Sequence, residues 1–348
     1  MNEPTQSIRR RAILTSLLGG LVAVALLGTS RIYAAGFSSS QVGVGVVNWI
    51  GYGPIYCAAA NGYYKKYGTD VKLVTFSDNS QMAGAVEGGE IAATTLTYDQ
   101  VLTANAKGWK LKVIMPVDYS VGGDAILATA AIHTVGDLKN RRVAFQPLSP
   151  SDFLLAYVLA GAGLSEKDIR PINATPEGVV AVMAASAVDA GVTYEPSVST
   201  IQKLGNGKLF HVLISSREAK GMITDVLVLK QSAIDSNPRL GDALVRGTLE
   251  GLAFMRSEPA KAAAIIAKTL EISVADVQAQ LPNIENPSLQ HVGDVFSPTD
   301  TLPSFHASGR IIGNILQKQG QITALPPIDA TYDSRFVVAV QANPGALK

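Results

Sequence analysis

The hydrophobic pattern changes along the chain, from one apolar run to short alternating segments and then to long amphipathic ones. Residues 13–27 are apolar and uncharged. Between residues 42 and 229, short β-branched runs alternate with apolar segments of helical length, and Gly, Pro, Asn, Asp and Ser are frequent between them. This alternation is typical of strands followed by helices. From Pro238 onward, apolar residues recur with the period of amphipathic helices. The pattern therefore predicts an α/β body with C-terminal helices.

The first strand–helix–strand unit is the most clearly defined part of this pattern. A β-branched strand is predicted over residues 42–47 and a helix over residues 55–66, which Gly68 ends. A second strand follows over residues 70–75. In open α/β sheets, ligands bind beyond the carboxyl ends of the strands, so the turn after the first strand is a candidate contact region. Its side chains suited to a ligand are Asn48, Trp49 and Tyr52.

The rest of the body repeats this alternation before the chain becomes helical. Further strands are predicted over residues 91–95, 111–116, 125–129, 142–146, 169–173, 189–193, 209–214 and 223–229. Helices are predicted between them over residues 81–88, 100–107, 134–139, 153–162, 178–186 and 197–204. The C-terminal helices are predicted over residues 239–256, 259–269, 273–280 and 301–318.

The composition is that of a folded protein without a strong charge. The chain has 348 residues, of which 47% are hydrophobic and 16% charged, and its formal net charge is +1. Residues 1–35 contain four arginines and one glutamate, which leaves the remainder slightly acidic. We therefore expect no nucleic-acid partner, because phosphate recognition needs a basic surface.

The N-terminal segment has the order of residues found in secretory signals. Three arginines, Arg9 to Arg11, precede the apolar residues 13–27, and small residues follow up to Ala35. The apolar run is shorter than the ~20 residues of a membrane-spanning helix. Residues 1–35 are therefore predicted to be a signal peptide, which places the body in the periplasm by the Sec or the twin-arginine route. The cleavage site is imperfect, so a membrane-anchored form stays open as an alternative.

Five turns at predicted strand ends carry polar or aromatic side chains that a ligand could contact. Three turns lie in the first half of the body and two in the second, and helix N-termini in such turns offer free N–H groups. The candidate ligand-binding residues in and near these turns are Asn48, Trp49, Tyr52, Asn79, Ser80, Thr97, Tyr98, Tyr119, Asp124, Ser149, Ser151, Asp152, Tyr194 and Glu195. Candidate aromatic walls among them are Trp49, Tyr52, Tyr98, Tyr119 and Tyr194.

Two carboxylates among the candidates bear on the charge of the ligand. Asp124 precedes a predicted strand and Glu195 follows one. A carboxylate repels nitrate or a sulfonate, whereas it attracts an amine, an amidine or a ring N–H group. The alternative is that either carboxylate pairs with a neighbouring Arg or Lys. Three other polar candidates, Ser149, Ser151 and Asp152, have an alternative as well, because helix capping alone would explain them.

The sequence contains no pattern that indicates catalysis. It has no nucleophile elbow, no dinucleotide-binding glycine motif after a strand and no P-loop. The single cysteine, Cys57, lies in an apolar segment and is expected to be a buried thiol. The four histidines show no metal-ligand spacing. We therefore expect a protein that is not an enzyme, with no catalytic residues, no metal site and no cofactor.

Four stretches of the chain together resemble a known family. They are Asn48 to Gly68, Val86 to Asp99, Gly136 to Phe153 and Ala187 to Ser197. Their order and spacing resemble those of the extracytoplasmic solute-binding proteins of ABC importers, in the group for nitrate, taurine, alkanesulfonates and thiamine precursors.

The resemblance implies a type II periplasmic binding protein fold, with two α/β lobes and a cleft that closes on the ligand. The first lobe would contain residues 42–125 and 225–348, and the second would contain residues 126–224. Residues 125–129 and 223–227 would cross between the lobes.

The resemblance also implies a function. The protein would be the substrate-binding component of an ABC importer, a monomer that captures a small nitrogen-containing solute and delivers it to membrane permease subunits. Taurine- or sulfonate-like, thiamine-pyrimidine-like and amine solutes all fit this expectation. One alternative is a ligand-sensing subunit of a membrane receptor. Another is a relative of the cytosolic enzyme that makes the thiamine pyrimidine, although the chain lacks the cysteine-rich iron motif of that enzyme.

Overall fold

The computed structural model describes residues 41–347, which belong to one compact unit. The predicted signal peptide, residues 1–35, lies outside the described residues. Within the described part, no helix is long and apolar enough to cross a membrane.

The first sheet has six strands and is mixed. Its order is β11-β4-β10-β3-β1-β2. Strand β1 pairs in parallel with β2 and β3, whereas β10 runs antiparallel to β3 and β4. The strands are β1 (Gln41–Val46), β2 (Asp70–Thr75), β3 (Ala93–Thr97), β4 (Leu111–Ser120), β10 (Thr224–Lys230) and β11 (Ile284–Glu285).

The second sheet has five strands in the order β7-β6-β8-β5-β9. Strand β6 pairs in parallel with β7 and β8, and β5 runs antiparallel to β8 and β9. The strands are β5 (Asp124–Thr129), β6 (Arg142–Phe145), β7 (Arg170–Asn173), β8 (Ala190–Tyr194) and β9 (Phe210–Ser215). The chain passes to this sheet between β4 and β5 and returns between β9 and β10. Each connection therefore leads into a strand that runs antiparallel to both of its neighbours, β5 in the second sheet and β10 in the first.

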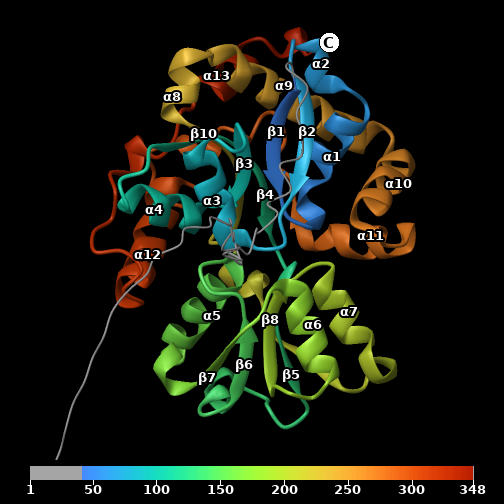
Figure 1. Cartoon of the computed structure of the whole chain (residues 1–348), viewed down its shortest axis with the longest axis vertical. Coiled ribbons are helices and arrows are strands. Elements are labelled where there is room, and N and C mark those ends of the chain that lie inside the picture. Colours follow the sequence, from blue (N-terminus) through green and yellow to red (C-terminus); the bar gives the residue numbers. More distant parts are fainter. Residues whose placement is uncertain (1–40, 348) are drawn as a thin grey trace, which may run out of the picture. The chain divides into compact units, whose positions relative to one another are not determined.

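Helices flank both sheets, and the C-terminal ones are concentrated around the first sheet (Figure 1). Helix α9 packs on α1, α10 packs on α1 and α11, and α12 packs on α4 and α5. The helices are α1 (Gly53–Ala60), α2 (Tyr63–Lys66), α3 (Asn79–Gly88), α4 (Tyr98–Ala106), α5 (Pro150–Gly161), α6 (Pro176–Ala184), α7 (Ser197–Lys203), α8 (Gln231–Ser236), α9 (Pro238–Ser257), α10 (Pro259–Leu270), α11 (Val274–Gln280), α12 (Phe305–Lys318) and α13 (Arg335–Ala342). The short 3-10 helix η1 (Ile50–Tyr52) precedes α1.

The α/β expectation is confirmed, with local corrections. The helix predicted over residues 55–66 is two helices, because Gly62 adopts a left-handed conformation with φ of 70° between α1 and α2. Strand β4 extends to Ser120, beyond the predicted end at residue 116. Helices α8 and α13 and the short strand β11 were not predicted, since their segments lack a long periodic pattern. The predicted lobe boundaries stay a prediction.

Candidate functional site

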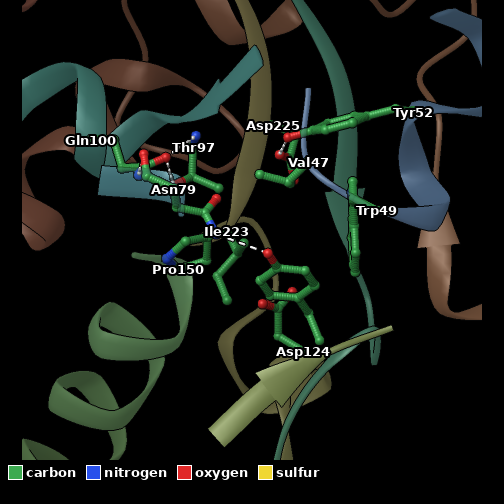
Figure 2. A pocket seen from close by; sticks show the side chains of 11 residues that line it. Val47, Trp49, Tyr52, Asn79, Thr97, Gln100, Asp124, Pro150, Ile223 and Asp225 are labelled. Carbon is green, nitrogen blue, oxygen red and sulfur yellow. Dashed lines mark hydrogen bonds between the residues drawn. The ribbon is translucent and has the colours of Figure 1, made fainter. Parts of the chain in front are cut away.

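A small cavity lies where strand ends and turns of both sheets meet (Figure 2). The turn after β1, the first turns of α3, α4 and α5, and the ends of β5, β8 and β10 all contribute to its wall. Its lining residues are Val47, Trp49, Tyr52, Asn79, Thr97, Gln100, Asp124, Pro150, Tyr194, Ile223 and Asp225.

The cavity is nearly filled by its own side chains. Only about 10 Å³ of it is free for the centre of a water molecule. That is the space of roughly one water molecule. Even a small organic molecule can therefore enter only if lining side chains or the surrounding elements move apart.

Trp49 forms one wall and is fixed by a carboxyl group and two glycines. Its indole Nε1 donates to both carboxyl oxygens of Asp118, at 3.1 and 3.2 Å. A Cβ atom on Gly51 would lie 2.3 Å from this nitrogen, and one on Gly123 would lie 2.5 Å from the far edge of the ring. The ring also meets Tyr194 edge to face, with centroids 5.7 Å apart. The glycines in both turns therefore leave free the space that the indole occupies.

Two aspartates meet behind this wall. Asp118 on β4 and Asp225 on β10 are register partners in the antiparallel pair. Tyr52 donates its hydroxyl to Asp225 Oδ1 at 2.6 Å, as the dashed line near the top of Figure 2 shows. The donors that hold these two carboxyls, an indole and a phenol, are neutral. Carboxylates directly opposite each other repel, so the pair favours a shared proton.

Asp124 is a second carboxyl that lines the cavity, besides Asp225. It is the first residue of β5, and its backbone N–H donates to Ser120 Oγ at 3.1 Å. Its side chain is almost fully buried, and Oδ1 has no hydrogen-bond partner among the described residues. A buried acceptor without a donor is costly, so a ligand that donated to this oxygen would relieve that cost.

Burial disfavours the charged form of all three carboxyls. It raises the pKa of Asp118 to about 8, and the neighbouring Asp124 adds to the rise. Burial and then the charge of Asp118 raise the pKa of Asp225 well above its ordinary value. Burial raises the pKa of Asp124 to about 7. The cluster therefore retains protons near neutral pH.

Hydrogen bonds join the two sides of the cavity. Asn79, at the start of α3, donates from Nδ2 to the Tyr194 hydroxyl at 2.8 Å and to Gln146 Oε1 at 3.1 Å. Gln100 Nε2 donates to the carbonyl of Leu148 at 3.2 Å. These side chains connect α3 and α4, next to the first sheet, with the turn after β6 and the end of β8 in the second sheet.

Six of the predicted site residues line the cavity. They are Trp49, Tyr52, Asn79, Thr97, Asp124 and Tyr194. The other eight, Asn48, Ser80, Tyr98, Tyr119, Ser149, Ser151, Asp152 and Glu195, do not line it. The turns that contribute are therefore largely the predicted ones, but the other predicted side chains in and near these turns do not line the cavity.

Two predicted aromatic walls have other positions. The Tyr98 ring stacks on Phe305 at 3.9 Å between centroids, and its hydroxyl lies 2.9 Å from Thr331 Oγ1. Tyr98 is thus a core residue, because it begins α4 on the face that α12 covers. Tyr119 is buried on β4, and its hydroxyl has no partner among the described residues.

The serines and Asp152 at the start of α5 follow the capping alternative. Ser149 is the N-cap and accepts from the Ser151 N–H at 3.2 Å. Asp152 accepts from the Leu148 N–H at 2.7 Å. It also accepts from Gln319 and Gln321 beyond α12, each at 3.0 Å. Ser80 bonds to Asp78 and lines a second cavity nearby, which Asn79 and Gln100 separate from the first.

Glu195, which the sequence analysis places at the ligand, does not line the cavity. Its carboxylate accepts from the Ser199 N–H at 3.0 Å and from the Ser199 hydroxyl at 2.9 Å. These bonds hold the carboxylate against the first turn of α7, where free N–H groups attract an anion. Asp124 therefore lines the cavity and Glu195 does not.

We expect Glu195→Gln to leave solute affinity within about twofold of the wild type, since the amide keeps the shape and an acceptor for Ser199. Titration calorimetry with any bound solute, alongside urea unfolding to confirm the fold, would measure this. A loss of affinity of tenfold or more, about 1.4 kcal/mol, would return Glu195 to the site.

Sequence reasoning missed several residues of the cavity. Val47, Gln100, Pro150, Ile223 and Asp225 line it, and Asp118 lies behind Trp49. A signal for the two aspartates was present, because each carboxyl interrupts an apolar strand. Buried charges in strands are rare unless they have a function.

The chain is similar to known binding proteins in sequence. A family model described as NMT1/THI5 like matches residues 49–262. A putative binding protein of Brucella abortus is 23% identical over 232 residues, which are 65% of this chain and 70% of that protein. A riboflavin-binding protein of Chloroflexus aurantiacus is 27% identical over 223 residues, 61% of each chain.

The fold is also found among solved structures. The periplasmic aliphatic sulphonate-binding protein of Escherichia coli superimposes with a TM-score of 0.67, over 86% of this chain and 100% of that one. The two are 20% identical, so the likeness concerns the fold. The predicted periplasmic binding protein fold is confirmed.

Proposed function

The chain belongs to the NMT1/THI5-like family, and we propose that it is the solute-binding component of an ABC importer. The observation that carries this proposal is the cavity, which is lined from both sheets by turns that lie within the family match or beside it. Similar proteins named as binders of riboflavin and of aliphatic sulphonates support a small organic solute.

The solute site is the cavity that contains Trp49, Asp124 and Asp225. Its polar groups are acceptors and neutral donors, arranged around aromatic surfaces. Such a site binds and orients a small molecule. The relatives are named as binding proteins, which supports a protein that captures its solute without transforming it.

Capture involves opening of the cavity. Space for roughly one water is too small for the solute, and the hydrogen bonds from Asn79 and Gln100 join the two sides in the closed arrangement. The connections between β4 and β5 and between β9 and β10 are the natural hinges. A solute that contacts both sides favours the closed state by its differential affinity.

The proposal places the protein outside the cytoplasmic membrane as a monomer. Residues 1–35 direct its export, and the closed form docks on permease subunits, as the family resemblance implies. The solute is a small nitrogen-containing organic compound, because the cavity carries carboxyl groups that suit N–H donors.

Solute binding and uptake test the function. A thermal-shift screen of the purified protein against amines, sulfonates, pyrimidines and flavins should give a cognate solute that raises the unfolding temperature. Binding to the folded state alone contributes about 2.7 kcal/mol at a hundredfold excess over Kd. A strain that lacks the protein should then lose high-affinity uptake of that radiolabelled solute. Uptake that persists unchanged in this strain would contradict the importer role.

A further inference from the structure

We propose that the cavity recognises a small organic cation through Asp124, Asp118 and Asp225, and discriminates against sulfonates and other anions. This inference rests on the proposed function, since it takes the cavity to be the solute site. It adds the sign of the charge on the solute and names the side chains that recognise this charge.

The charge of the cavity wall is the first reason. Two of the eleven lining residues, Asp124 and Asp225, carry carboxyls, and none of these described residues is Lys, Arg or His. The Arg217 guanidinium comes close to Gly122, but it is exposed and donates to Asn283 Oδ1 at 2.7 Å. An anion that entered the cavity would therefore meet carboxyls without a compensating cation, which opposes binding.

The second reason is that the carboxyls form a cluster held by neutral donors. Asp118 and Asp225 face each other across β4 and β10, with Trp49 Nε1 on one and the Tyr52 hydroxyl on the other. Carboxylates buried without a cation are unfavourable. A bound ammonium or amidinium group supplies the missing charge, so the cluster is better satisfied with a cation than without one.

Asp124 supplies the direct contact. Its side chain is 2% exposed, lines the cavity, and has an Oδ1 atom without a partner among the described residues. In Figure 2 it lies across the cavity from Asp225, so a solute between them would meet one carboxyl on each side. Charge-assisted hydrogen bonds of this kind are about twice as strong as neutral ones.

An organic cation fits better than a metal ion. Among residues 41–347, no three His, Cys, Asp or Glu side chains are placed to hold a metal. The wall instead combines the carboxyls with the aromatic rings of Trp49, Tyr52 and Tyr194. Aromatic faces attract organic cations and pack against their carbon atoms.

Proton linkage distinguishes a cation from an anion. Within the cluster, the charges of Asp118, Asp124 and Asp225 interact with one another. Two further carboxyls, Asp99 on α4 and Glu195 after β8, interact with the cluster through their charge, and the Tyr52 phenol also faces it. A cation stabilises the ionised cluster, so its binding displaces a carboxyl proton to solvent. An anion would bind best to the protonated cluster and would take up a proton.

The experiment compares matched solutes of opposite charge. The protein is titrated by calorimetry at about pH 6 and pH 8 with two matched pairs of solutes. One pair is butylammonium and butanesulfonate, and the other is benzamidinium and benzenesulfonate. Separate titrations use taurine, Ca²⁺, Mg²⁺ and Zn²⁺. We expect each cation to bind at least tenfold more tightly than its sulfonate. Its affinity should rise with pH, and buffers of different ionisation heat should report proton release.

Two isosteric variants assign the effect to the cluster. Asp225→Asn keeps an acceptor for Tyr52 and Asp124→Asn keeps the backbone bond to Ser120, so both should fold. Each should reduce the preference for the cation at least tenfold. The control Asp242→Asn removes an exposed carboxylate that pairs with Arg246 on α9, and it should leave the preference unchanged.

Several outcomes would overturn the inference. One such outcome is a sulfonate that binds more tightly than its matched cation, and another is taurine binding as tightly as butylammonium. The others are proton uptake on binding and a metal ion that binds more tightly than the organic cations. Each of them would leave the importer role intact. If no solute of any charge binds here or in the thermal-shift screen, the proposed function fails and the inference falls with it.

Discussion

Replacing Gly251 by alanine should destabilise the protein by about 3 kcal/mol or more, although alanine is the better helix former. Gly251 lies in α9, where a Cβ atom would be 1.9 Å from the Pro54 carbonyl oxygen and 3.0 Å from the Ala58 nitrogen of α1. These are backbone atoms, so no side-chain rotation relieves the overlap and the two helices must separate. Overpacking of this kind costs 1–3 kcal/mol and occasionally more, which exceeds the gain of about 0.5–1 kcal/mol from helix propensity.

The same separation should weaken solute binding. Helix α1 follows directly on the turn that carries Trp49 and Tyr52, so its displacement moves two walls of the cavity. Urea unfolding measures the stability, and calorimetry measures the affinity. The matched control is Gly88→Ala in α3, where a Cβ atom meets nothing within 4 Å; we expect it to stabilise by about 0.5–1 kcal/mol. Equal effects of the two substitutions would contradict this account of α1–α9 packing.

The ligand-free protein should lose stability as the pH rises from about 5 to 8. The folded-state pKa values of Asp118, Asp124, Asp152 and Asp99 are raised to about 8, 7, 7 and 6, in each case chiefly by burial. In this interval the folded state binds more protons than the unfolded state. The free energy of unfolding therefore falls with rising pH, by up to about 1.4 kcal/mol per pH unit for each group that titrates.

Summed over the coupled cluster, we expect a loss of about 3 kcal/mol or more between pH 5 and pH 8. Below about pH 4 the sign reverses, because carboxylates with lowered pKa values, such as Asp137 and Asp189, become protonated. Thermal unfolding across this pH range measures the curve. Asp118→Asn, which still accepts from Trp49, should flatten it, whereas Asp242→Asn should not. A stability that rises between pH 5 and pH 8 would contradict the buried acidic cluster.

Much of the secondary structure could be predicted because it depends on local pattern. The β-branched runs and periodic apolar segments predict β1 to β10 and most helices, and the predicted ends lie within a few residues of the observed ones. Boundaries were less certain where one residue's backbone decides, as at Gly62 between α1 and α2. The short strand β11 depends on pairing with the end of β4, which leaves no local signal.

The candidate site could be predicted in part for the same reason. Turns at strand ends are visible in the sequence, so Trp49, Tyr52, Thr97 and Tyr194 were found. The direction of each side chain depends on what packs around it. Tyr98 follows Thr97 directly, yet its ring stacks on Phe305 of α12, a helix more than 200 residues away along the chain.

The sequence by itself determined the α/β class, the family resemblance and the turns that carry the site. It also predicted carboxyls among the site residues. Only the tertiary structure decided which carboxyls lie in or behind the wall of the cavity. Asp118 and Asp225 meet because β10 returns from the second sheet to pair with β4, whereas Glu195 bonds to Ser199 at its own helix. Strand pairing between distant segments sets these contacts, and their energies come from burial and charge proximity that a linear pattern does not contain.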